Sequence, residues 1–144
     1  MATDSFMWTL FCDDVRQEVG NKLSFVGVYG PNLVVPAMPT SLLKLCCVMM
    51  VRVPAKKVPK SIEFRVLRDQ EELFAAEVPE AALHETVSAV PTDKDDDHFL
   101  HFHAIAQFVN LPLAARCLIQ SRATVDGEEL KGGSLVLTSV EATH

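Results

Sequence analysis

Short runs of apolar and β-branched residues, with apolar and polar positions alternating, recur along most of the chain between Gly, Pro and Asp residues. In Ser61–Leu67, for example, Ile62, Phe64 and Val66 fall on one side of an extended chain, and a glutamate and an arginine fall on the other. Helical periodicity is almost absent. This pattern predicts an all-β protein, an antiparallel two-sheet sandwich of immunoglobulin-like or related topology, with a small barrel as the alternative.

About eight strands are expected, in a single domain spanning residues 1–144. A polar break is expected from Asp13 to Asn21, and Gly132-Gly133 is expected to precede the last strand. One short helix is expected near 79–90, where Pro79 suits the first helical turn. The expected strands cover Phe6–Cys12, Lys22–Tyr29, Leu43–Val53, Ser61–Leu67, Leu73–Val78, His98–Val109, Cys117–Val125 and Ser134–Val140. The brief segment Leu33–Val35 is expected to be an edge strand or a covering loop.

Several strand positions that should face solvent carry apolar side chains. A contiguous apolar patch on a sheet face usually marks a binding site for another protein or for a second copy of the chain. The alternative is that loops or the expected helix cover these positions. The candidate interface residues are Phe11, Val26, Val28, Val48, Met50 and Phe99.

Two histidines stand two residues apart in an expected strand. His101 and His103 would share one face, which is how cupin-like proteins begin a metal site. The set is incomplete, because Gln107 occupies the nearest position suited to a third ligand and the only later histidine is His144. The acidic run from Asp93 to Asp97 lacks the glycine and glutamate of a calcium loop and is interpreted as a solvated loop.

Charge and cysteine content restrict the partners and the compartment. The 144 residues carry a net charge of -6, which disfavours binding to nucleic acid. No membrane anchor or export signal is recognised, so a cytoplasmic protein with four reduced, buried cysteines is expected. No sequence motif indicates a cofactor, and none is expected.

Three segments in the first part of the chain carry a resemblance. They are Cys12-Asp13-Asp14-Val15-Arg16, the stretch from Gly20 to Gly30 that reads Gly-Asn-Lys-Leu-Ser-Phe-Val-Gly-Val-Tyr-Gly, and Val35-Pro36. With these the chain resembles an uncharacterised family of small bacterial proteins known only as a domain of unknown function. The resemblance implies a bacterial, cytoplasmic β-sandwich and brings no activity, cofactor or catalytic residue.

The sequence therefore does not identify a function. No complete catalytic set is recognised, which favours a non-catalytic binding module that self-associates through an apolar sheet face. The alternative is a metal-binding enzyme or metal-regulated protein that uses His101 and His103. A third possibility is a small-molecule site in a cleft near Trp8 or Tyr29.

Overall fold

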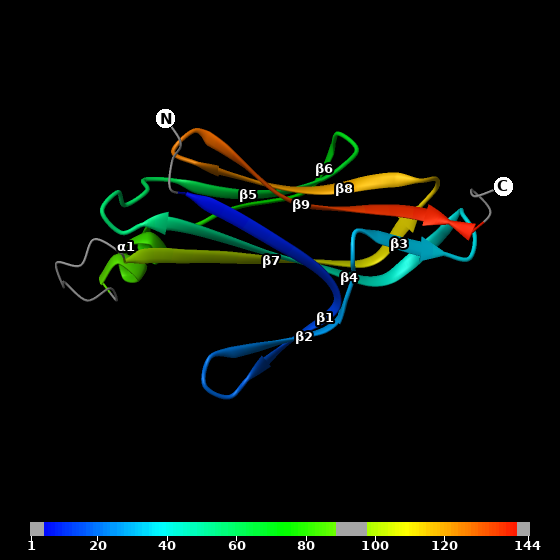
Figure 1. The fold of residues 1–144 in the computed structure, drawn as a ribbon, viewed down its shortest axis with the longest axis horizontal. Helices are drawn as coiled ribbons and strands as arrows, with labels where there is room; N and C mark the ends of the chain where they lie inside the picture. The colour runs from blue at the N-terminus through cyan, green and yellow to red at the C-terminus, as the bar shows by residue number, and fades with distance from the viewer. Residues whose placement is uncertain (1–4, 89–97, 141–144) are drawn as a thin grey trace.

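The computed structural model describes residues 5–88 and 98–140, and within them the chain forms nine strands and one helix. The strands lie in two layers, as Figure 1 shows. The elements are β1 (Phe6–Glu18), β2 (Lys22–Val28), β3 (Asn32–Val35), β4 (Thr40–Pro54), β5 (Ile62–Arg68), β6 (Glu71–Glu77), α1 (Glu80–Ser88), β7 (Phe99–Leu113), β8 (Cys117–Val125) and β9 (Glu128–Ser139).

The two layers are separate sheets, which confirms the predicted all-β sandwich. The four-stranded sheet has the order β2-β1-β4-β7, and the five-stranded sheet has the order β3-β9-β8-β5-β6. All pairings are antiparallel except that of β3 with β9. No helix within the described residues is long and apolar enough to cross a membrane.

The main core lies between the inner faces of the two sheets, where alternate residues of each strand are buried. In β5 the buried residues are Ile62, Phe64 and Val66, and every second residue of β8 from Cys117 to Val125 is also buried. This alternation is the expected one. The short helix α1 covers one end of the core with the buried side chain of Leu83.

β1 closes one side of the sandwich by passing close to β9. A Cβ atom added to Gly132 would collide with the side chains of Ser121 and Thr9, and one added to Gly133 would lie 3.3 Å from the Thr9 carbonyl oxygen. The Thr9 and Ser121 hydroxyls hydrogen bond at 2.7 Å at this crossing. The glycine pair is therefore inside β9, where it permits close backbone approach, and the prediction that the last strand begins only after it is wrong.

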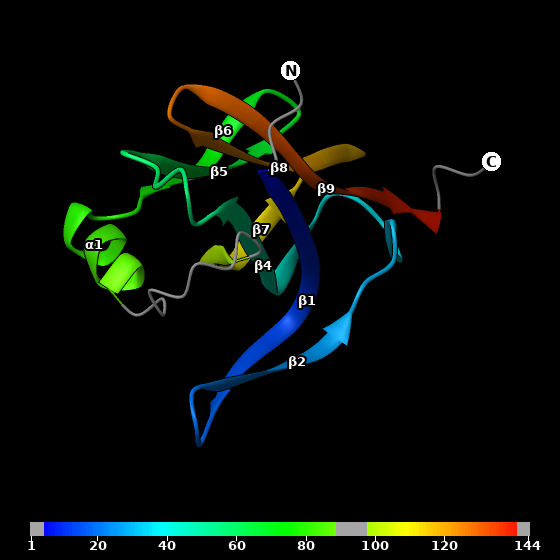
Figure 2. The same ribbon diagram turned by 60° about the vertical axis from the view of Figure 1, so that its left-hand side comes forward.

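The polar break predicted after Cys12 is also wrong, because β1 continues to Glu18 and pairs with β2 over this stretch. Figures 1 and 2 show this hairpin extending beyond the two layers. A projecting two-stranded ribbon has solvent on much of its surface, so polar residues suit it as well as apolar ones do.

Candidate functional site on the outer face of the four-stranded sheet

The strand register brings side chains from β1, β4 and β7 into rows on the outer face of the four-stranded sheet. Residues that are directly opposite on neighbouring strands point to the same face. The rows, read from β1 to β7, are Phe6–Arg52–His101, Trp8–Met50–His103, Leu10–Val48–Ile105 and Cys12–Cys46–Gln107. The first two rows reach solvent, and the last two lie nearer the β1–β2 hairpin.

Arg52 is the centre of the solvent-exposed part of this face. Its guanidinium carbon lies 4.3 Å from the ring centroid of Phe99 and 5.7 Å from that of Phe6, so a cation is held between two aromatic rings. We call the set Phe6, Trp8, Met50, Arg52, Phe99, His101 and His103 the aromatic patch. Phe6 is 52% exposed and Trp8 37% exposed, which makes the patch a surface that offers apolar area together with one permanent positive charge.

His101 and His103 are both exposed on this face, opposite Arg52 and Met50. Within residues 5–88 and 98–140, no group of three or more His, Cys, Asp or Glu residues is placed to hold a metal ion. The Arg52 guanidinium beside His101 would also repel a bound cation. The acidic run from Asp93 to Asp97 lies outside the described residues.

The part of the outer face next to the hairpin is buried instead. Cys12, Cys46 and Val48 form a second, smaller core there, separate from the main one. Four partly buried residues pack against it, namely Leu10, Val15, Phe25 and Ile105. Because Val15 and Phe25 come from the hairpin, the chain itself covers this portion of the sheet.

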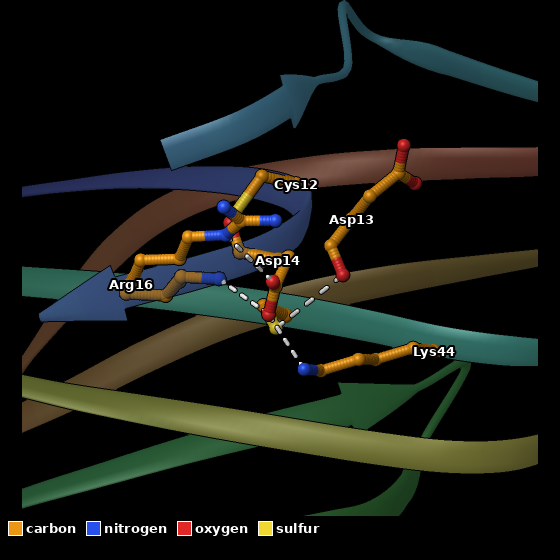
Figure 3. A network of polar contacts seen from close by, with 7 residues as sticks. Cys12, Asp13, Asp14, Arg16 and Lys44 are labelled. Carbon is orange, nitrogen blue, oxygen red and sulfur yellow. Dashed lines mark hydrogen bonds and ion pairs between the residues drawn. The ribbon is translucent and has the colours of Figure 1, made fainter. Parts of the chain in front are cut away.

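A polar network surrounds the base of the hairpin, where β1 leaves the sheet (Figure 3). Lys44 Nζ lies 2.6 Å from Asp14 Oδ1, and Arg16 Nε lies 3.5 Å from Asp14 Oδ2. The hydrogen bond from Lys44 holds the pKa of the Asp14 carboxyl below its usual value. The neighbouring Asp13 carboxylate points away and accepts a hydrogen bond from the Tyr29 hydroxyl, so the two carboxylates do not form a catalytic pair.

Two of the four cysteines meet at the same place. Cys12 and Cys46 are directly opposite on β1 and β4, and both are fully buried. The Cys12 thiol donates to the Asp14 carbonyl at 3.4 Å, and the Cys46 thiol donates to the Asp13 carbonyl at 3.8 Å. Burial raises the pKa of Cys12 to about 11, and burial also raises that of Cys46.

The structure separates the six predicted interface residues. Val26 and Val28 are exposed on β2, while Met50 and Phe99 are half-buried in the aromatic patch. Val48 is 1% exposed because the hairpin covers it. Phe11 is 4% exposed in the main core, so the prediction that it points outward is wrong.

The residues that sequence reasoning missed are Phe6 and Arg52, while Trp8 was named only for a possible small-molecule cleft. Along β1, the alternate residues that include Phe6 and Trp8 are more apolar than Met7, Thr9 and Phe11. The first set nevertheless faces outward, and the second set faces the core. No local signal identifies the faces, because the Thr9 hydroxyl finds its partner only in the buried Ser121 of the opposite sheet.

The two aromatic residues named for a small-molecule site lie in different surroundings. Tyr29 packs against the main core, and Trp8 belongs to the outer face. A shallow cavity of about 410 Å³ does lie beside the hairpin, lined by Val15, Gln17, Ile105 and Gln107. Its lining offers two amides and apolar side chains.

Comparison with known proteins agrees with the resemblance seen in the first part of the chain. No curated protein matches the chain. A family model does match, over residues 7–138, which covers all nine strands almost completely. The chain therefore belongs to the family of unknown function DUF6941.

Proposed function

We propose that the chain is a non-catalytic protein-interaction module that pairs with a second copy of itself along β7. The observation that carries this proposal is the composition of that strand. β7 is an edge strand of 15 residues, Phe99–Leu113, and it contains no Asp, Glu, Lys or Arg. Within the described residues β4 is its only strand partner, so one side of β7, which we call the β7 edge, faces away from the sheet.

An unpaired edge presents a row of backbone N–H and C=O groups that can pair with another strand. Proteins usually protect such edges with charged side chains, prolines, bulges or short strand length. The other three edges follow this rule: β3 has only four residues, β6 carries three glutamates, and β2 begins with Lys22. In β7 the stretch Phe99–Val109 contains no Asp, Glu, Lys, Arg or Pro residue, so neither charge nor proline protects it.

A second copy is the partner that fits this edge most simply. Two identical edges related by a two-fold axis pair in antiparallel fashion, so each copy supplies the same residues to the other. The four-stranded sheet would then continue into its partner as one sheet of twice the width. The aromatic patch borders the β7 edge through Phe99, His101 and His103, so its apolar area would extend the contact beyond the backbone pairing.

Sedimentation equilibrium at tens of micromolar protein tests the proposal. The wild type should be a dimer. The double substitution His103→Lys and Gln107→Lys places charge on two exposed positions of β7 and should yield a folded monomer. Val34→Lys is the matched control, because Val34 is an exposed apolar residue on the edge strand β3 of the other sheet, and this variant should stay dimeric.

Two results would contradict the proposal. One is a wild type that sediments as a monomer throughout this concentration range. The other is a dimer that both lysine substitutions in β7 leave unchanged, since pairing along that edge could not tolerate them.

A metal-binding role for His101 and His103 is the second candidate, supported by their shared exposure on one face. Metal analysis of protein purified without a histidine tag separates the two proposals. Bound zinc or nickel that is lost in the variant with His101→Ala and His103→Ala would favour the metal-binding role, and unchanged affinity in that variant would exclude these two residues as ligands.

A further inference from the structure

The placement of Cys12 and Cys46 is independent of the β7 edge and suits a different chemistry. Both thiols belong to the outer face of the four-stranded sheet, and their Cα atoms are register partners on adjacent antiparallel strands. Both thiols also lie in the same small buried core. Two sulfur atoms are therefore already neighbours in the folded chain.

The geometry of an antiparallel pair matches what a disulfide requires. Directly opposite residues have Cα atoms about 4.5 or 5.5 Å apart, depending on the type of pair. Disulfides need Cα atoms about 4.4 to 6.8 Å apart with side chains on the same side. Cys46 and Cys47, although adjacent in sequence, point to opposite faces, and Cys47 belongs to the main core.

We propose that Cys12 and Cys46 form a reversible intramolecular disulfide by exchange with a low-molecular-weight disulfide, and that this bond locks the β1–β2 hairpin to β4. Cys12 is the last residue of β1 that pairs with β4, and beyond it β1 pairs only with β2. A covalent bond at Cys12 therefore fixes the point at which the hairpin leaves the sheet.

The exchange runs in two balanced steps. The Cys46 thiol loses its proton and attacks one sulfur of the small disulfide, which breaks that S–S bond and releases one small thiolate that takes up the proton. The Cys12 thiol then loses its proton and attacks the Cys46 sulfur of the mixed disulfide, which breaks that S–S bond and releases the second small thiolate to take up the proton. The two cysteines are oxidised by two electrons, and the small disulfide is reduced to two thiols.

Cys46 is the attacking residue because of its neighbourhood. Its pKa is raised by burial, but the positive charge of Lys44 two residues away opposes that rise. For Cys12, burial and the nearby charges of Cys46, Asp13 and Asp14 raise the pKa, and only the backbone hydrogen bond to Asp14 opposes them. Cys46 is therefore assigned the attack, because a lysine charge favours its thiolate.

The hairpin controls access to both sulfurs. Cys12 and Cys46 have no exposed surface, and Val15 and Phe25 from the hairpin pack against them. A small disulfide can reach Cys46 only when this part of the hairpin lifts from the sheet. Shortening the covering side chain in Val15→Ala should therefore speed the exchange severalfold without altering either cysteine.

The test uses the full chain, incubated under native conditions with oxidised glutathione. Intact mass should fall by two hydrogen atoms, and peptide mapping should place the new bond between Cys12 and Cys46. The variant carrying both Cys47→Ala and Cys117→Ala should behave in the same way, because neither residue takes part. Cys12→Ser should stop at a glutathione adduct on Cys46.

The outcomes that overturn the proposal are equally specific. A folded wild type that keeps four free thiols, or one that accumulates glutathione adducts without closing the bond, shows that the pair does not act as a dithiol. An exchange rate that Val15→Ala leaves unchanged shows that the hairpin does not control access. Because sedimentation is not the readout, failure here leaves the proposed self-association standing, and the reverse is also true.

Discussion

The guanidinium of Arg52 on β4 lies over the ring of Phe99 on β7, 4.3 Å from its centroid. The two residues are on adjacent strands but not directly opposite, since Arg52 pairs with His101 and Phe99 pairs with Pro54. The contact is therefore a diagonal one across the outer face. It joins the charged centre of the aromatic patch to the start of the β7 edge.

We expect Arg52→Ala to lower the free energy of unfolding by about 1 kcal/mol, because it removes the stacking of a cation on Phe99 and Phe6. Urea denaturation measures this change. Arg116→Ala is the control, since Arg116 is an exposed arginine in the connection between β7 and β8, and its removal should change stability by less than about 0.5 kcal/mol. Equal effects of the two substitutions would mean that the ring contacts contribute nothing.

The two phenylalanines of β1 should differ sharply in their contribution to stability. Phe11 is 4% exposed in the main core and Phe6 is 52% exposed on the outer face. We expect Phe11→Ala to cost about 3 to 5 kcal/mol, as a large cavity forms, and Phe6→Ala to cost less than about 1.5 kcal/mol. The same denaturation measurement compares them, and a larger cost for Phe6 would mean that the faces of β1 are reversed.

Alternation alone was enough to predict the strands whose two faces differ clearly. β5 and β8 have an apolar row against a polar row, and the structure buries the apolar row in each. The hairpin of β5 and β6 and the short helix α1 after Pro79 also follow from local signals. These elements were predictable because each is determined by residues that are close together in the sequence.

The faces of β1 could not be predicted in this way, because both rows are apolar. The alternate residues of β1 that include Phe6 and Trp8 can face outward because the hairpin covers the far end of this set and Arg52 lies over the Phe6 ring. Arg52 is distant in sequence from Phe6, so the site requires the strand register, which alternation does not supply. The pairing of Cys12 with Cys46 could not be predicted either, because it also depends on the strand register.

The ion pair of Asp14 with Lys44 should make stability depend on pH in the acidic range. The Asp14 carboxyl has a lower pKa in the folded chain than its unfolded value of about 4, so the pair stabilises the folded state above that pH. This contribution is lost as the pH falls through the lower, folded-state pKa. Its size is modest, because solvent screens the exposed pair.

Asp14→Asn should therefore destabilise the chain at neutral pH, and the difference from wild type should shrink once the pH is well below about 4. Unfolding by urea at several pH values gives the comparison. Asp126→Asn would be a poor control, since Asp126 Oδ1 accepts backbone hydrogen bonds from Lys60 and Ser61. Glu72→Gln, at an exposed position on β6, is the better one. A difference between Asp14→Asn and wild type that stays constant over this range would exclude the ion pair as its cause.

Gly27 and Gly30 offer a matched pair that tests how the hairpin joins the sheet. Gly27 has a φ of +69° and faces Asp13, so a Cβ atom there would collide with the Asp13 carboxylate and force a disfavoured backbone conformation. We expect Gly27→Ala to cost about 1 to 3 kcal/mol. Gly30 has open space around it and no positive φ, so Gly30→Ala should be nearly neutral.

The double variant Asp13→Ala with Gly27→Ala divides the cost of the Gly27 substitution into its two causes. Shortening Asp13 removes the collision but leaves the backbone conformation unfavourable, so part of the lost stability should return. Asp13→Ala alone also removes the hydrogen bond from Tyr29. The stability of this single variant must therefore be measured to complete the double-mutant cycle. If the two substitutions were strictly additive, Asp13 would not be the group that Gly27 accommodates, and the close approach of β1 and β2 at the base of the hairpin would need another explanation.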